Sequence, residues 1–388
     1  MNVPMSSPDL TDAERAAVNA VMQTNRLSMG PEEKGFEKAV ADFVGAKHAV
    51  AVSSGTAGLH MLVRTAGIHE GDYVITSPFS FVSSTNVILF ERAVPVFVDV
   101  DPISCNLDPE QVSQAAEDLA AGGKAAERWL PRHGASNGER LKAVLAVDIF
   151  GQMADYDAIK SVVERHGLDL IEDSCEALGA AYKGRPAGLE GDAGIFAFYP
   201  NKQITTGEGA MIVTNRDDWA QMLRALRNQG RAPGDTWLAH THLGYNYRLN
   251  ELASAIGRVQ MSRIEELLEK RSKVANWYHE RLQDLPGVET LRVVPETTRM
   301  SWFVYIVRFD GGIDRDDVIR RLGERGVPCR PYFSPIHLQP YMRDMFGYRE
   351  GDYPVTEDLG RRSAALPFSG VMTLEQVEYV CETLRDVL

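Results

Sequence analysis

The residue in this chain best suited to covalent chemistry is a lysine between an aromatic run and a glycine-rich turn. Lys202 follows the segment IFAFYP and precedes TTGEG and the apolar stretch AMIVT. A lysine is usually a solvated surface group. Apolar neighbours can desolvate its amine, however, and a neutral amine is a nucleophile that forms Schiff bases with carbonyl compounds. Lys202 is therefore the candidate catalytic residue.

Two anion-related features precede this lysine. Asp173 ends the apolar segment LDLIEDS, and open α/β sheets bind ligands at the carboxyl ends of their strands. The segment SSGTAGLH at 53–60 joins a predicted strand to a helix, where free N–H groups and the helix dipole favour a phosphate. Each feature also has a simpler interpretation, as a residue that caps the helix after it. A Rossmann dinucleotide site is disfavoured, because no GxGxxG follows a predicted strand.

In this order, the three features match the needs of pyridoxal 5'-phosphate. The turn would anchor the phosphate, and Asp173 would hold the proton on the pyridinium nitrogen so that the ring acts as an electron sink. Lys202 would form the internal aldimine with the cofactor. Each feature is a weak signal alone, and their ordered combination is a strong one.

The alternation of segments around these residues predicts an α/β fold. Short apolar strands alternate with amphipathic helices from residue 49 to residue 174, and strands without polar alternation are buried on both faces. This pattern predicts a mostly parallel central sheet flanked by helices. Two further helices are expected before it, over 8–24 and 31–44. The stretch 118–140, rich in Gly, Ala and charge, is expected to form an insertion loop or the edge of a lid.

The sequence pattern of the chain changes after Asn246. Sustained helical periodicity predicts one long helix over 249–282, followed by a strand over 298–309 and a C-terminal helix. We therefore expect a large domain at 1–254, including the N-terminal helices, and a smaller α+β domain at 255–388. A chain of 388 residues is consistent with two domains.

Composition restricts the setting and the partners. The formal charge of −13 disfavours nucleic acid as a partner, since phosphate neutralisation needs clustered Lys and Arg. The sequence shows no signal peptide and no apolar stretch of membrane-spanning length, so a cytoplasmic protein is expected. Four scattered cysteines without a CxxC pair predict neither a disulfide framework nor a metal site.

Ordered sequence blocks along nearly the whole chain resemble the DegT/DnrJ/StrS sugar aminotransferases, which are fold-type I pyridoxal-phosphate enzymes. The blocks are SSGTAGLH, TSPFSFVSSTNVI, PVFVDVD, IEDSCEALGA, FYPNKQITTGEGAMIVTN, LRNQGR, GYNYRLNELASAIGRVQ and RPYFSPIHLQP. By this resemblance Lys202 is the aldimine lysine and Asp173 the pyridinium partner. Gly55, Thr56 and Ala57 correspond to the phosphate-binding turn.

The resemblance assigns four further positions around the cofactor. Phe81 falls where the family stacks an aromatic ring on the cofactor, and Glu176 where relatives carry Gln, His or Glu. Asn246 matches a residue that reaches the phosphate from the neighbouring subunit, which implies a homodimer with shared active sites. Ala197 departs from the family, since many relatives have a serine there that holds the phosphate. Its loss removes one hydrogen bond, about 1 kcal/mol, and predicts weaker cofactor retention.

The resemblance also indicates the reaction. Arg330, Tyr332 and His337 fall where substrate contacts are expected, the first two toward a nucleotide diphosphate. Together with Glu176, the block that contains them resembles the branch that aminates C4, typified by GDP-perosamine synthases. The expected reaction is ping-pong transfer of an amino group from an amino acid such as glutamate to a nucleotide-linked keto-sugar, as in polysaccharide or O-antigen biosynthesis.

Three alternatives remain open at this point. A sugar 3-aminotransferase, or an aminotransferase for cyclitols or aminobenzoates, would share the fold and the cofactor. The dehydratase branch replaces the aldimine lysine with histidine, so the presence of Lys202 disfavours it. A non-catalytic regulatory protein that binds pyridoxal phosphate is disfavoured by the intact Lys202 and Asp173.

Overall fold

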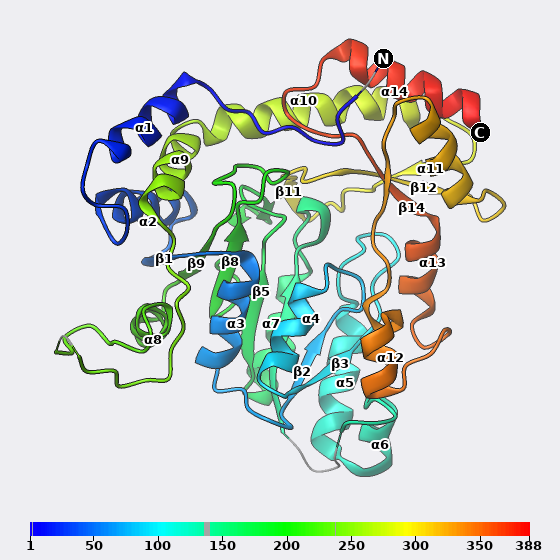
Figure 1. Ribbon diagram of the computed structural model, residues 1–388. Coiled ribbons are helices and arrows are strands. Elements are labelled where there is room, and N and C mark those ends of the chain that lie inside the picture. The colour runs from blue at the N-terminus through cyan, green and yellow to red at the C-terminus, as the bar shows by residue number, and fades with distance from the viewer. Residues whose placement is uncertain (2, 136–139, 237) are drawn as a thin grey trace.

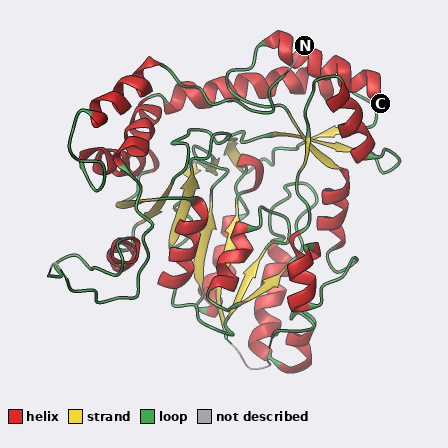
Figure 2. Cartoon of the chain, in the orientation of Figure 1, coloured by secondary structure: helices red, strands yellow, loops and turns green. Residues whose placement is uncertain are grey.

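A seven-stranded sheet forms the centre of the larger part of the chain (Figures 1 and 2). The computed structural model describes residues 1, 3–135, 140–236 and 238–388. The strand order is β1 (His48–Val52), β9 (Ala210–Thr214), β8 (Ala193–Ala197), β5 (Asp169–Asp173), β4 (Leu141–Val147), β2 (Tyr73–Thr76), β3 (Val94–Phe97). β9 runs in the direction opposite to the other six strands of this sheet, so the expected mostly parallel α/β sheet is confirmed.

Successive side chains of these strands enter two different cores. In β1, Ala49 and Ala51 face one core, whereas Val50 and Val52 face the other. The first core is closed by α2 (Pro31–Val44), α5 (Pro109–Ala121) and α7 (Tyr156–His166), and the second by α3 (Gly55–Thr65), α4 (Ser83–Phe90) and α8 (Asp217–Arg227). Burial on both faces explains why the strands read as continuous apolar runs.

The long helix expected after residue 249 is two helices. α9 (Glu251–Ser262) packs against α2 and against α1 (Asp12–Met22), and α10 (Ile264–Leu282) then crosses to the second, smaller sheet (Figure 1). The break falls at Arg263, whose guanidinium bonds to Asp9 and Glu14 near the N-terminus. Helical periodicity continues across the break, so the sequence pattern could not reveal it. With 19 residues, α10 is about 28 Å long.

The smaller antiparallel sheet carries the second half of the fold. Its strand order is β10 (Val288–Thr290), β12 (Tyr305–Phe309), β14 (Ser363–Leu366), β13 (Arg330–Pro331), covered by α10, α11 (Arg315–Glu324) and α14 (Leu374–Val387). The strand expected over 298–309 is shorter, because its first part is β11 (Thr297–Arg299). That strand pairs with β6 (Ala181–Tyr182) beside β7 (Arg185–Pro186).

The expected division at residue 254 remains a proposal, and two segments pack across it. Val3 lies in the core of the smaller sheet, where its N–H donates to Gly326. In the other direction, η2 (Ile336–Leu338) and α12 (Pro340–Phe346) contribute Ile336, Met342 and Phe346 to a core of the large sheet. After them, α13 (Pro354–Arg362) leads back to β14.

The described part of the 118–140 insertion packs against the C-terminal segment. It contains α6 (Gly123–Glu127) and a loop in which Arg132 pairs with Asp352 and the His133 N–H donates to Phe346. None of its described residues lines the pocket discussed below. Residues 136–139 of the expected lid lie outside the described residues.

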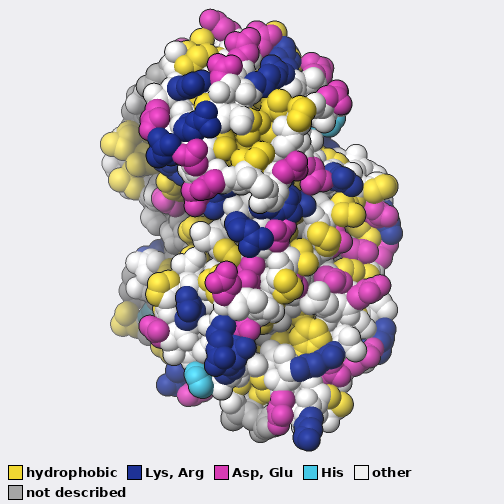
Figure 3. Space-filling model, turned by 90° about the vertical axis from the view of Figure 1, so that its right-hand side faces the viewer, with side chains coloured by type: hydrophobic (Ala, Val, Ile, Leu, Met, Phe, Trp, Pro, Cys, Tyr) yellow, Lys and Arg dark blue, Asp and Glu magenta, His cyan; other side chains and the backbone are white. Residues whose placement is uncertain are grey.

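The surface and the helices bear on possible partners. On the face in Figure 3, Lys and Arg side chains alternate with Asp and Glu and form no broad basic patch. Among the helices of the described residues, none combines the length and the apolar character needed to cross a bilayer.

Candidate active site

A pocket of about 530 Å³ opens at the carboxyl end of β5. Its described walls come from the start of α3, the loop before α4 and the first turn of α4, the ends of β4, β5 and β8, the loop 199–208 and the segments at 303 and 332–333. The lining residues are Ser54, Gly55, Thr56, Ser80, Phe81, Ser83, Ser84, Val147, Asp173, Cys175, Glu176, Ala197, Tyr199, Asn201, Lys202, Glu208, Phe303, Tyr332 and Phe333. The topology thus brings together three features that lie up to 147 positions apart in the sequence.

Lys202 reaches into this pocket from the loop between β8 and β9. Its Nζ lies 3.6 Å from Glu176 Oε1 and 3.8 Å from the ring centroid of Phe303, and 13% of its side chain is exposed. Burial raises the pKa of the Glu176 carboxyl, and the nearby Lys202 ammonium opposes that shift. The backbone N–H of Phe150 donates to the second oxygen of Glu176 at 2.9 Å and fixes its orientation.

Asp173 is buried at the end of β5, and two groups hold its carboxylate. Ser84 Oγ donates to Oδ2 at 2.7 Å, and the N–H of Cys175 donates to Oδ1 at 3.2 Å. Ser84 was not among the sequence-predicted residues. The serine-rich start of α4 was its only signal, and the contact depends on how β2 and β5 are placed in the sheet.

A buried carboxyl pair lies directly beneath Asp173. Ser174 Oγ is 2.7 Å from Asp148 Oδ2 and 2.9 Å from Glu172 Oε1, and both acids are fully buried. A hydroxyl has one proton, so it can donate to only one of these oxygens. The other contact needs a proton on a carboxyl group, which makes one of the two acids neutral.

The bonding around each acid shows which one is neutral. The N–H groups of Gly188 and Glu190 donate to the two oxygens of Glu172, which favours its ionised form. Burial, and then the charge of Glu172, raises the pKa of Asp148 well above its usual value. Asp148 therefore carries the proton and donates to Ser174, which in turn donates to Glu172.

The start of α3 supplies the anion-binding wall. Ser54 Oγ accepts the N–H of Ala57 at 3.1 Å, and the first-turn N–H groups of Gly55 and Thr56 have no partner within the helix. A Cβ on Gly55 would lie 3.2 Å from both Ala197 Cβ and Cys175 Sγ, so a side chain there would narrow the space between these three residues, here called the cradle. Ala57 is buried behind this wall and does not line the pocket.

The other predicted residues divide between the pocket and the rest of the fold. Phe81 lines the pocket with 62% of its surface exposed, and Tyr332 lines the opposite wall, where burial raises the pKa of its hydroxyl. Two of the residues predicted to contact the substrate, Arg330 and His337, do not line this pocket. Arg330 is exposed on β13 outside the pocket. His337 is fully buried against Glu357, because η2 turns its ring into the core, and this burial lowers its pKa.

Asn246 also lies outside this chain's own pocket. It is an exposed residue on the segment 228–250, whose described residues (228–236 and 238–250) project from the molecule beside α8 (Figure 1). The exposed position leaves its side chain accessible to another molecule.

A mostly parallel sheet with a buried carboxylate, a lysine and a helix N-terminus at one pocket defines a fold-type I pyridoxal-phosphate enzyme. Over residues 8–385 the chain matches the DegT/DnrJ/EryC1/StrS aminotransferase family, and it belongs to that family. It is thus an aminotransferase, its cofactor is pyridoxal 5'-phosphate, and its family aminates sugars.

Individual relatives match over their whole length. The chain is 36% identical to the GDP-perosamine synthase of Caulobacter vibrioides over 389 residues, covering 100% of this chain and 98% of that protein. It is 34% identical to the spore coat polysaccharide biosynthesis protein SpsC of Bacillus subtilis, covering 100% and 97%. Among solved structures, DesV of S. venezuelae superposes with a TM-score of 0.87 at 30% identity, covering 99% and 98%.

The residues of the pocket fit this cofactor. A buried, hydrogen-bonded carboxylate suits a protonated ring nitrogen, and the amine of Lys202 suits an aldehyde. The cradle at Gly55, next to first-turn N–H groups, suits a phosphate. Every one of these groups is present in a single chain and lines the same pocket.

Proposed function

We propose that this aminotransferase transfers the amino group of an amino acid, with glutamate as the first candidate, to the C4 keto group of a nucleotide-linked sugar. The observation that carries the proposal is the placement of Lys202 Nζ beside Glu176 in a pocket that also holds Asp173 and the start of α3. The whole-length similarity to a GDP-perosamine synthase supports a sugar nucleotide as the acceptor. For amination at C4, support comes from that similarity and from Glu176 and Tyr332, since Arg330 and His337 lie elsewhere.

Five residues of the pocket have a role in this reaction. When bound, pyridoxal phosphate supplies an electron sink for the charge that develops at the donor's α-carbon. Gly55 and Thr56 bind the phosphate through backbone N–H groups, and Asp173 accepts the hydrogen bond of the ring N–H. Lys202 Nζ takes the proton from the α-carbon and later returns one to the sugar carbon. Glu176 lies 3.6 Å from that amine and orients it toward the reacting carbon.

The charge of the pocket supports a second copy of the chain as the partner. Among the described lining residues, Lys202 is the one cation, against the carboxylates of Asp173, Glu176 and Glu208. A sugar nucleotide and a donor carboxylate both need further positive charge. The segment 228–250 carries several Arg and His residues and could supply that charge to the pocket of a second copy.

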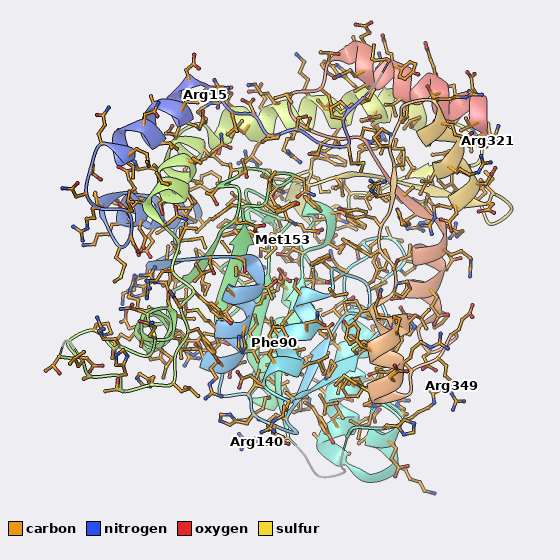
Figure 4. The ribbon with its side chains drawn as sticks, in the orientation of Figure 1. Arg15, Phe90, Arg140, Met153, Arg321 and Arg349 are labelled. Atoms are coloured by element: carbon orange, nitrogen blue, oxygen red, sulfur yellow. The ribbon has the colours of Figure 1, made fainter. Side chains whose placement is uncertain are left out.

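Apolar exposure supports the same partner. Leu238 and Leu243 on this segment are 81% and 78% exposed. Phe90, which Figure 4 labels at the end of α4, is 55% exposed. Large apolar side chains that are this exposed on one loop are typical of an interaction surface. We therefore include in the proposal a homodimer in which Asn246 reaches the phosphate of the neighbouring subunit.

The first experiment follows the cofactor spectrum. Purified enzyme saturated with pyridoxal phosphate should show a band that bleaches when glutamate is added, with release of the keto acid. After borohydride reduction, the peptide that contains position 202 should carry the cofactor in the wild-type enzyme and lack it in Lys202→Ala. Lys183 is a surface lysine paired with Asp157, so Lys183→Ala should retain the cofactor on the Lys202 peptide. If the wild-type enzyme binds no cofactor through Lys202, the proposed catalytic role is wrong.

Two further assays address position and assembly. Nucleotide sugars with a keto group at C4 or at C3 would be offered as acceptors, and the aminated carbon would be identified by NMR. Product aminated only at C3 would contradict the C4 assignment. Mixing Lys202→Ala with Asn246→Ala should restore part of the activity, because a mixed dimer contains one intact site. A monomer in sedimentation measurements would contradict shared sites.

A further inference from the structure

Arg271 on α10 is a buried cation that the roles above do not use. Its side chain is 5% exposed, and in the described part of the chain no carboxylate forms an ion pair with it. The guanidinium instead bonds to four backbone carbonyls. Nε donates to Trp302 at 2.8 Å, Nη1 to Lys202 at 3.3 Å, and Nη2 to Asn201 at 3.2 Å and to Phe303 at 2.7 Å.

These carbonyls belong to two segments that form opposite sides of the pocket. Residues 201 and 202 lie on the loop between β8 and β9, whereas 302 and 303 lie just before β12 of the smaller sheet. The side chains of Lys202 and Phe303 meet in the pocket, with Nζ 3.8 Å from the ring centroid. Arg271 thus links the backbone of residues 201–202 to that of residues 302–303, while the side chains of Lys202 and Phe303 contact each other in the pocket.

The backbone at the second segment needs such support. Trp302 has a φ of +39°, in the left-handed region that a bulky residue adopts only under constraint. Arg271 binds the carbonyl of Trp302 and the carbonyl after it, and the N–H of Phe303 donates to Phe150 at 3.2 Å. The position of the Phe303 ring therefore depends on bonds that Arg271 supplies.

Stability alone is a poor reason for this arrangement. Burial of a guanidinium without a counter-charge is costly, and desolvation lowers the pKa of Arg271 to about 10. An apolar side chain would fill the same space against Phe368 at lower cost. An apolar side chain could not bind the four carbonyls of the two segments, whereas the planar guanidinium of arginine does.

We propose that Arg271 is a positioning residue for amino transfer, because it fixes the Lys202 main chain against segment 301–303 and so sets Nζ over the ring of Phe303. The inference rests on the proposed role of Lys202. Loss of this clamp displaces the amine that moves the proton, while the groups that bind the phosphate and the ring nitrogen stay in place. Its signature is a loss of kcat with an unchanged KM.

The first test needs no bound cofactor. The cofactor-free enzyme would be labelled with limiting acetic anhydride, and the extent of labelling at Lys202 compared by mass spectrometry with that at Lys183 in the same sample. In Arg271→Met, Lys202 should be labelled several-fold faster, because Nζ leaves the cover of the Phe303 ring, while Lys183 should be unchanged. Phe303→Leu should produce the same change with Arg271 intact.

The second test is kinetic. Arg271→Met should lower kcat by about 100-fold, the effect expected when a catalytic group is misplaced by about 1 Å. Arg271→Lys keeps the charge but cannot span four carbonyls, so it should restore little of the rate. Arg315→Met is the matched control, since Arg315 donates to the carbonyls of Gly360 and Ser363 away from the pocket.

Several outcomes would overturn the proposal. Wild-type labelling of Lys202 with wild-type kcat in Arg271→Met is one, and an equal loss of rate in Arg315→Met is another, because it would indicate general destabilisation. If Arg271→Met does not fold, Arg271→Lys and Phe303→Leu carry the same comparison. Failure of the proposed function is seen separately, as cofactor that does not attach to Lys202 in the wild-type enzyme.

Discussion

The buried pair beneath the cofactor site predicts different outcomes for two isosteric substitutions. In Asp148→Asn, the amide nitrogen replaces the protonated oxygen and donates to Ser174. Its carbonyl oxygen takes the place of Oδ1, which in the wild-type enzyme accepts from the N–H of Ala154 at 3.0 Å and from the hydroxyl of Tyr156 at 2.9 Å. Every bond of the wild-type enzyme is kept and one amide N–H is added without a partner, so we expect the free energy of unfolding to fall by about 1 kcal/mol.

Glu172→Gln has no such solution. Both oxygens of Glu172 accept backbone N–H groups, from Gly188 and from Glu190. An amide NH₂ must face one of these donors, which leaves a buried N–H unpaired and removes bonds to a charged acceptor. Such a loss costs about 3 kcal/mol. The two variants should therefore differ in stability by about 2 kcal/mol or more.

The pH dependence gives an independent check of which acid holds the proton. The pKa of Asp148 is raised in the folded state from the usual value of 3.8, so the native protein keeps a proton that the unfolded chain releases. This contribution to stability is fully present below pH 3.8 and is lost as pH rises toward the folded pKa. Asparagine does not titrate, so Asp148→Asn should gain stability relative to wild type as the pH rises above 3.8.

Urea unfolding followed by circular dichroism at several pH values would measure these differences. The reasoning is refuted if Asp148→Asn is as unstable as Glu172→Gln at every pH. A stability difference between Asp148→Asn and wild type that does not vary with pH would refute the assignment of the proton to Asp148. In that case the hydroxyl of Ser174 would have to be oriented the other way.

Other substitutions test the cradle and the packing. Ser84→Ala removes one of the two hydrogen bonds to Asp173, and should weaken cofactor binding about tenfold, or ~1.4 kcal/mol, in a fluorescence titration; unchanged affinity would contradict this role. Ala197→Ser should tighten cofactor binding by about 1 kcal/mol through the added hydroxyl; a lower affinity in the same titration would contradict this and would mean that the space beside Gly55 is too narrow for the hydroxyl. Gly257→Ala places a Cβ 2.5 Å from an aromatic ring on α2 and should cost about 1–3 kcal/mol, measured as a lower Tm. In Gly323→Ala the new methyl meets nothing within 4 Å, so this helix should gain about 0.5–1 kcal/mol; equal effects of the two changes would refute the packing argument.

The sequence by itself determined the alternation of strands and helices between residues 48 and 174 and the residue types of the site. Apolar runs without polar alternation required strands buried on both faces, and the structure confirms the sheet they form. The lysine, the strand-end aspartate and the glycine turn were visible because each follows a local rule: flanking apolar residues, the end of a strand, or the start of a helix. Their roles at the cofactor remain predictions.

Only the tertiary structure decided which distant groups meet. Ser84 reaches Asp173 across 89 positions of sequence, and Arg271 reaches the Lys202 carbonyl across 69, so no local pattern could show either bond. The break at Arg263 and the burial of His337 are likewise imposed by partners from elsewhere in the chain. Periodicity records which face of a segment is apolar. It does not record what that face packs against, and here packing places the pocket residues.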